Sequence, residues 1–152
     1  LAAYAEEHAK SAEMIAGLLR SGERLQRYRH LDLDQLEKAL ANADGRTVFV
    51  VTESVFSMDG DRAPLGDLAA LCEKFDASLI VDEAHSMLAC GPTGRGAVEH
   101  FGVTKQVRIL YGTFSKAFGA MGGFVAGAIA PLGGTTRDDR EADCPGHGGN
   151  HG

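Results

Sequence analysis

The chain has 152 residues, and its 21 acidic side chains outnumber its 15 lysines and arginines, which gives a formal net charge of −6. This charge argues against a nucleic-acid surface, which needs clustered lysine and arginine, and no apolar run approaches the ~20 residues of a membrane span. The N-terminus has no basic segment followed by an apolar core, and the 3 widely spaced cysteines do not suggest a disulfide framework, so we expect a reduced, cytoplasmic protein.

Helical and strand-like segments alternate along the chain. Apolar residues at helical spacing predict helices, and short runs of β-branched and aromatic residues predict strands. Gln35 follows Asp32 by three positions, which is a capping-box signal for a helix start, and Pro64 is placed to open another helix. The expected elements are a helix at 5–20, a strand at 24–30, a helix from 33, a strand at 47–52, a helix from 65, and strands at 78–82, 107–111 and 123–128. This alternation predicts an α/β fold with a mostly parallel sheet flanked by helices.

The last segment, residues 129–152, departs from this pattern. It has almost no apolar residues to bury, so we expect a disordered tail that is separate from the folded domain at 1–128. Cys144, His147 and His151 have the spacing of zinc ligands, but three candidates on a glycine-rich tail are more typical of solvated side chains. We therefore predict no metal site.

Two of the expected strands lead to residues that can carry chemistry. The apolar run at 79–81 ends at Asp82, and the run at 107–111 is followed by a loop of small residues that contains Lys116. Because ligands of open parallel sheets bind beyond the carboxyl ends of the strands, these two side chains can flank one ligand. Pyridoxal phosphate binds an amine at its aldehyde and a carboxylate at its ring nitrogen, so the pair suggests this cofactor. Taken singly, Asp82 is as consistent with a helix N-cap, and Lys116 is more typical of a surface loop.

Four blocks of sequence, in order, extend this interpretation. They are VTESVFSMDGD at 51–61, VDEAHS at 81–86, GRG at 94–96 with EH at 99–100, and GTFSKAFG at 112–119 followed by GGFVAG at 122–127. Over roughly residues 20–128 the chain resembles the α-oxoamine synthases, a branch of the fold-type-I pyridoxal-phosphate enzymes related to the class II aminotransferases. The resemblance implies that residues 1–128 are part of the large, cofactor-binding domain of such an enzyme.

The resemblance also implies roles for individual residues. Lys116 matches the catalytic lysine that forms an imine with the cofactor, and His85 matches a catalytic histidine hydrogen-bonded to the cofactor's phenolic oxygen. Alone, His85 would be interpreted as a structural histidine. The remaining matches are all to cofactor-binding residues: Asp82 beside the ring nitrogen, Ser57 near the phenolic oxygen, Glu53 as an acid in the same loop, and Thr113 as a phosphate-binding hydroxyl.

One position of the family pattern does not align directly. These enzymes usually stack a histidine on the cofactor ring, upstream of the segment that ends in His30, and counting back without gaps reaches Ser11. The histidine near that position is His8. Either an insertion of about three residues makes His8 the stacking, cofactor-binding residue, or that residue is absent.

Members of this family join an amino acid to an acyl-coenzyme A thioester with loss of carbon dioxide. The resemblance implies these substrates and a homodimeric full-length enzyme. It does not choose among the enzymes that make aminoketone precursors of biotin, haem and sphingoid bases, or the ligase of the threonine pathway, which is a glycine C-acetyltransferase. It covers the middle of the family's large domain, without the glycine-rich N-terminal segment or the small C-terminal domain. We therefore expect the 152-residue chain alone to show little or no turnover.

Two alternatives fit parts of the pattern. The run that ends in DEAH at 82–85 is also similar to the Walker B strand of a nucleotide hydrolase, with Asp82 on magnesium and Glu83 polarising water. That function requires an upstream G-x-x-x-x-G-K-[ST] loop, and the sequence has none. The other alternative is a non-catalytic remnant of an α-oxoamine synthase that only folds or associates. An absorbance band from bound cofactor would distinguish the expected function from both.

Overall fold

A computed structural model of the chain describes residues 2–8, 20, 24–43 and 45–127. Their strands are β1 (Ala2–Glu6), β2 (Arg24–Tyr28), β3 (Val48–Glu53), β4 (Ala77–Asp82), β5 (Val107–Thr113) and β6 (Gly123–Gly127). They form one sheet in the order β2-β1-β3-β4-β5-β6, in which every neighbouring pair is parallel except β5 and β6. The predicted α/β fold with a mostly parallel sheet is confirmed.

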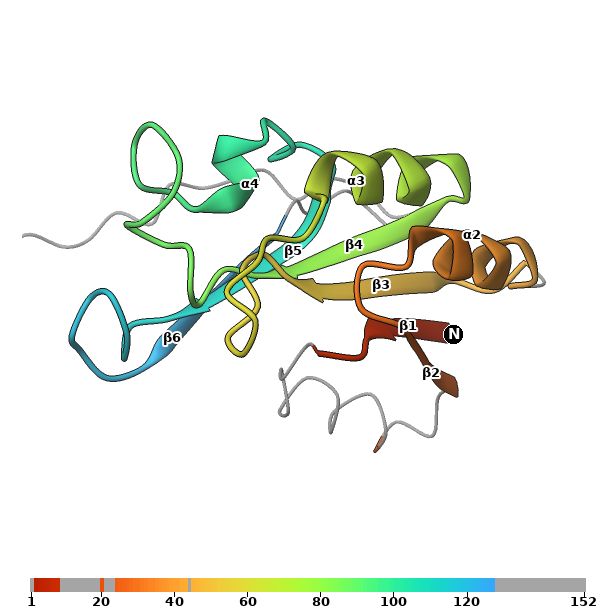
Figure 1. Ribbon diagram of the computed structural model, residues 1–152, viewed down its shortest axis with the longest axis horizontal. Coiled ribbons are helices and arrows are strands. Elements are labelled where there is room, and N and C mark those ends of the chain that lie inside the picture. The colour runs from red at the N-terminus through yellow and green to blue at the C-terminus, as the bar shows by residue number, and fades with distance from the viewer. Residues whose placement is uncertain (1, 9–19, 21–23, 44, 128–152) are drawn as a thin grey trace, which may run out of the picture.

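The described helices α2 (Leu33–Ala41), α3 (Leu65–Lys74) and α4 (Ala97–His100) lie on the same side of the sheet (Figure 1). Asp32 caps α2 as predicted, because its side chain accepts a hydrogen bond from the backbone N–H of Gln35 at 2.8 Å. The side chain of Gln35 does not complete the expected box, since it accepts from the N–H of Arg29 at 2.7 Å. Pro64 is the N-cap of α3, where its missing N–H costs no helical hydrogen bond. In the part of the chain that the structure describes, no helix has the length and apolar character to cross a membrane.

The central strands are buried on both faces. Val50 belongs to the main core between the sheet and the helices, whereas its neighbour Val51 belongs to a smaller cluster on the opposite face, and both are 0% exposed. Burial on both faces explains why the sequence of β3 is a continuous apolar run, as expected of a parallel strand. The helices complete the main core with buried leucines: Leu36 and Leu40 from α2, and Leu65 and Leu68 from α3.

The structure corrects the start of the helix expected at residues 5–20. Ala5 and Glu6 are extended, because they end β1, which lies inside the sheet between β2 and β3. All of β1 is buried, and a short, wholly buried apolar run has no periodicity that separates a strand from a helix. Most of the remaining expected helix lies outside the described residues, as do Ser11 and the predicted tail at 129–152 with its Cys144, His147 and His151.

Candidate active site

The carboxyl ends of β3, β4 and β5 surround a cavity of about 400 Å³. The strand register brings the side chains there together, since Glu53 is paired with Asp82, and Asp82 with Tyr111. The residues that line the cavity are Glu53, Ser57, Asp82, Ala84, His85, Tyr111, Gly112, Thr113, Ser115 and Lys116. The cavity therefore lies where open parallel sheets bind their ligands.

Most of the side chains singled out from the sequence meet in this cavity. The lining includes Glu53, Ser57, Asp82, His85, Thr113 and Lys116, but not His8. Sequence reasoning missed four lining residues: Ala84, Tyr111, Gly112 and Ser115. Of these, Ser115 could have been predicted from the sequence as a second hydroxyl of the site, because it comes two positions after Thr113 and directly before Lys116.

Asp82 is the last residue of β4, and hydrogen bonds fix both its main chain and its side chain. Its carbonyl accepts from the N–H of Ser54 at 2.8 Å, and its Oδ1 accepts from the N–H of Ala84 at 2.8 Å. A carboxylate held in this way at the cavity wall can pair with a protonated ring nitrogen through a charge-assisted hydrogen bond.

Lys116 and His85 are in direct contact. The Nζ atom of Lys116 lies 2.6 Å from Nε2 of His85, and both side chains are exposed. An ammonium group has only donors, so a Lys116 ammonium can donate to Nε2 of His85 when the ring proton is on Nδ1. An amine that can pass a proton to a neighbouring imidazole becomes the neutral nucleophile that attacks an aldehyde.

Two hydroxyl groups lie side by side just before Lys116. Oγ1 of Thr113, at the end of β5, is 2.7 Å from Oγ of Ser115 and accepts from the N–H of Ser115 at 3.2 Å. The Thr113 hydroxyl can also donate to the carbonyl of Gly122 at 3.1 Å, which holds the loop between β5 and β6 closed on itself. Paired hydroxyls at a cavity wall are suitable hydrogen-bond donors for a phosphate.

Glu53 and Ser57 come from the end of β3 and the loop that follows it. Glu53 is buried, and its Oε2 accepts from the backbone N–H of Ser57 at 3.3 Å. This bond turns the loop back toward the sheet, so that Ser57 lines the cavity although it lies four positions beyond the strand.

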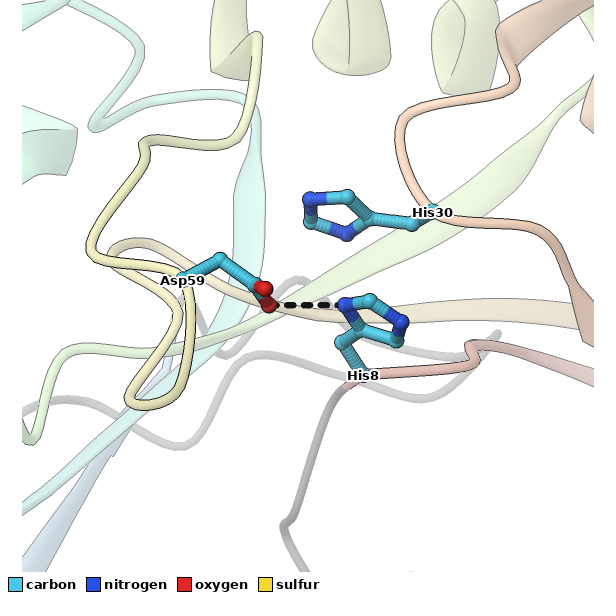
Figure 2. A group of neighbouring side chains, drawn as sticks. All are labelled: His8, His30 and Asp59. Atoms are coloured by element: carbon cyan, nitrogen blue, oxygen red, sulfur yellow. Dashed lines mark hydrogen bonds and ion pairs between the residues drawn. The ribbon is translucent and has the colours of Figure 1, made fainter.

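His8 makes its contacts with a different group of residues (Figure 2). Its ring stacks on the ring of His30, with centroids 4.2 Å apart and planes inclined by 16°, and its Nδ1 lies 2.7 Å from Oδ2 of Asp59. The stacking of His8 on a cofactor ring stays a prediction, because the ring that it contacts in the structure is that of His30.

His30 links three segments at this edge of the sheet. Its Nδ1 is 2.8 Å from Oε1 of Glu6, at the end of β1, and its Nε2 is 2.8 Å from Oδ2 of Asp61, in the loop after β3. Burial works to lower the pKa of His30, but the hydrogen bonds to Asp61 and Glu6 outweigh it and raise that pKa above its ordinary value of 6.5. His30 accordingly favours its imidazolium form, a cation between two carboxylates.

The ligand atoms of His8, His30 and Asp59 lie within 4.8 Å of one another, which is close enough to consider a metal ion. The ring geometry does not suit one, since nitrogen lone pairs lie in the ring planes and two nearly parallel stacked rings do not direct them at one point. Both nitrogens of His30 are also engaged by carboxylates. We assign no metal to this group.

Glu83 faces away from the cavity. It is 0% exposed, and its carboxylate accepts hydrogen bonds from the N–H groups of Ala97 and Val98. A buried carboxylate in this position does not polarise a water molecule, which is the role that the nucleotide-hydrolase alternative requires of Glu83.

The chain is similar to known proteins in both sequence and structure. The model of the family described as aminotransferase class I and II matches residues 10–132. The 8-amino-7-oxononanoate synthase of Nitrosococcus oceani is 49% identical over 126 residues, which are 82% of this chain and 33% of that enzyme. The chain thus spans about a third of the length of the curated relatives it matches.

Solved structures extend this similarity to three dimensions. A serine palmitoyltransferase from S. paucimobilis, with pyridoxal phosphate and myriocin bound, has a TM-score of 0.78 and 35% identity over 83% of this chain and 32% of that one. An 8-amino-7-oxononanoate synthase from Francisella tularensis has a TM-score of 0.70 and 34% identity over 84% of this chain and 36% of that one.

Proposed function

The chain belongs to the aminotransferase class I and II family, in its α-oxoamine synthase branch, and on this premise we propose that it is part of a pyridoxal-phosphate-dependent acyltransferase. Its sheet is part of the large domain of a fold-type-I pyridoxal-phosphate enzyme. The whole enzyme would condense an amino acid with an acyl-coenzyme A. Relatives at 45% to 49% identity are named 8-amino-7-oxononanoate synthases, which favours that activity over that of a glycine C-acetyltransferase.

The observation that carries this proposal is the convergence of three side chains on one cavity. Asp82 comes from the end of β4, His85 from the turn that follows it, and Lys116 from the loop after β5. The cavity thereby combines an anion, a proton acceptor and an amine nucleophile, which are the groups that pyridoxal-phosphate chemistry requires from a protein.

The side chains of the cavity fit the functional groups of the cofactor. When bound, pyridoxal phosphate supplies an aldehyde that captures amines and a ring that withdraws electrons from the attached carbon. Each part of the molecule has a suitable partner among the lining residues: Lys116 for the aldehyde, Asp82 for the ring nitrogen, His85 and Ser57 for the phenolic oxygen, and Thr113 with Ser115 for the phosphate.

Different residues of the chain would provide the negative charge beside the cofactor ring and the groups that transfer protons. Asp82 would place its carboxylate at the ring nitrogen, and the Ala84 N–H holds that carboxylate in position. Nε2 of His85 lies next to Nζ of Lys116 and is placed to take its proton as the amine attacks the aldehyde. A free Nζ in this position is also a general base for the α-proton of the amino acid.

The family resemblance supports three further parts of the proposal. The whole enzyme would be a homodimer, it would work in the cytoplasm, and its ring-stacking residue would be His8. Glu53 would act next to the cofactor through the loop that it anchors at Ser57.

Titration of the chain with pyridoxal phosphate tests the proposal. Capture by Lys116 should produce a visible absorbance band that saturates with cofactor, and Lys116→Ala should abolish it. Lys105→Ala is the matched control, because Lys105 is an exposed lysine that does not line the cavity. A band that survives Lys116→Ala, or that Lys105→Ala removes equally, would contradict the assignment, and a parent chain without any band would favour the non-catalytic remnant.

A further inference from the structure

Glu83 is a fully buried acid between two residues of the cavity wall, Asp82 and Ala84. Its Oε1 accepts from the N–H of Val98 at 2.6 Å, and its Oε2 accepts from the N–H of Ala97 at 3.0 Å. Among the residues that the structure describes, no lysine, arginine or histidine forms an ion pair with it. A carboxylate buried without a cation is costly unless its oxygens are hydrogen-bonded, and these bonds to the start of α4 meet that need.

Gly96 makes this close approach possible. It is the N-cap of α4 and has a φ of +98°, a conformation that favours glycine. A Cβ atom at Gly96 would lie 2.5 Å from Oε2 of Glu83, so a side chain there would displace the carboxylate. The backbone of α4 and the Glu83 side chain therefore fit one another closely.

The main chain of Glu83 holds the turn that presents His85. Its N–H donates to the carbonyl of Tyr111 in β5 at 2.8 Å, and its carbonyl accepts from the N–H groups of Ser86 and Met87, both at 3.1 Å. His85 is one of the residues of this turn, and its side chain is exposed. Glu83 is thus bonded to β5 and its own turn through the main chain, and to α4 through the side chain.

Burying the carboxylate of Glu83 costs free energy. Burial raises the pKa of Glu83, although the N–H groups of Val98 and Ala97 work to lower it. An apolar side chain would fill the same space without this cost but would not bind the two N–H groups. A carboxylate kept here at such a cost is consistent with a need for defined geometry in the turn.

We propose that Glu83 is the positioning residue of the site, which fixes the turn at 83–87 to α4 and thereby sets the directions of the Asp82 carboxylate and the His85 imidazole. The inference rests on the proposed function for what Asp82 and His85 do, but not for how Glu83 holds them. Glu83 itself does not contact the cavity.

The test compares Glu83→Gln with Glu99→Gln in the full 152-residue chain. The glutamine side chain of Glu83→Gln keeps the shape, but its amide NH₂ would face a backbone N–H, so one of the two hydrogen bonds is lost. Glu99 is the matched control, because it also accepts from backbone N–H groups, those of Thr93 and Arg95 at 3.1 Å each, but it binds the loop before α4 and not the turn at 83–87. Both variants are measured well below their own melting midpoints, so that global stability does not enter the comparison.

The experiment has two readouts. The first is the NMR resonances of the His85 ring in ¹⁵N-histidine-labelled chain without cofactor, and the second is the dissociation constant for pyridoxal phosphate. We expect Glu83→Gln to shift the His85 resonances and to weaken cofactor binding about tenfold, the size of one lost hydrogen bond to a charged group. Glu99→Gln should change neither.

A folded Glu83→Gln chain with unchanged His85 resonances and unchanged cofactor affinity would overturn the proposal, and so would an equal change in Glu99→Gln. If the parent chain binds no pyridoxal phosphate, the proposed function fails by itself, and the His85 resonances still decide the role of Glu83. If Glu83→Gln does not fold, Glu83→Asp, which keeps the charge on a shorter side chain, is judged by the same two readouts.

Discussion

The Nζ atom of Lys116 lies 2.6 Å from Nε2 of His85, although the two residues are 31 positions apart in the chain. The parallel pairing of β4 and β5 brings them together, because both strands end at the same edge of the sheet and each is followed directly by the segment that carries one of them. An amine and its proton acceptor are thereby placed at the wall of one cavity.

Replacing His85 with asparagine should slow the capture of pyridoxal phosphate, since the ammonium of Lys116 loses the group that accepts its proton. General-base assistance of this kind is worth about 10²-fold in rate or more. Stopped-flow absorbance measures the capture rate. His100→Asn is the control, because His100 is exposed and contacts the ring of Phe101 outside the cavity. A His85→Asn chain that captures cofactor at the parent rate would refute the proton-transfer role.

Replacing Asp82 with asparagine should weaken the binding of pyridoxal phosphate by about tenfold or more, because the hydrogen bond at the ring nitrogen loses its charge. The fold should survive, since the amide oxygen can still accept from the N–H of Ala84. Equilibrium dialysis gives the dissociation constant, and Asp67→Asn, on the exposed side of α3, should leave it unchanged. Equal affinity in the Asp82 and Asp67 variants would count against the ring-nitrogen assignment.

The stability of the chain should depend on pH through His30. Its pKa is raised in the folded state, by hydrogen bonds to Asp61 and Glu6 that outweigh the opposing effect of burial, so the folded chain binds this proton more tightly than the unfolded chain. The stabilisation is therefore fully present below the ordinary pKa of 6.5 and is lost as the pH rises through the raised value.

Urea unfolding of the parent and of His30→Gln, at a pH below 6.5 and again well above the raised pKa, measures this dependence. We expect the parent's advantage in unfolding free energy to shrink at the higher pH. An advantage that stays constant, or that grows with pH, would show that His30 does not act as a cation between its carboxylates.

Two glycine-to-alanine substitutions should have opposite effects. Gly96→Ala places a side chain at a φ of +98° and against the buried carboxylate of Glu83, so we expect a loss of at least about 2 kcal/mol in unfolding free energy. Gly66→Ala, inside α3 with nothing within 4 Å of the new Cβ, should stabilise the chain by about 0.5–1 kcal/mol. Differential scanning calorimetry compares the two, and a Gly96→Ala chain as stable as the parent would contradict the described packing.

The ends of the central strands could be located from the sequence. The strands expected at 47–52 and 78–82 are β3 and β4, because long β-branched and aliphatic runs that end abruptly at Glu53 and Asp82 indicate buried parallel strands with a polar rim. Adding the rule that ligands bind beyond such ends was sufficient to place the cavity.

Other elements could not be located because their own residues carry no distinguishing pattern. The buried run of β1 has no polar face, and the four-residue α4 is too short to show a helical period. The antiparallel direction of β6 could have been predicted from the length of the loop before it. The loop at 114–122 is shorter than the crossover of about a dozen residues that a parallel neighbour requires, so β6 pairs antiparallel with β5.

At the site, the family resemblance implied the roles of individual residues. It did not predict the tertiary contacts between them. The stack of His8 on His30 joins residues from the ends of different strands, and the packing of Glu83 against Gly96 depends on how α4 folds back. Neither contact leaves a spacing pattern in the sequence, because each depends on the three-dimensional path of the intervening chain.

The central claim is that Lys116 is the amine through which this chain holds pyridoxal phosphate. Borohydride reduction of the chain with the cofactor, followed by proteolysis and mass spectrometry of the peptides, tests it most directly. The account predicts a pyridoxyl group on the peptide that contains Lys116, and none on the peptide that contains Lys105. A label on another lysine at equal or higher yield, or no label on Lys116, would contradict it.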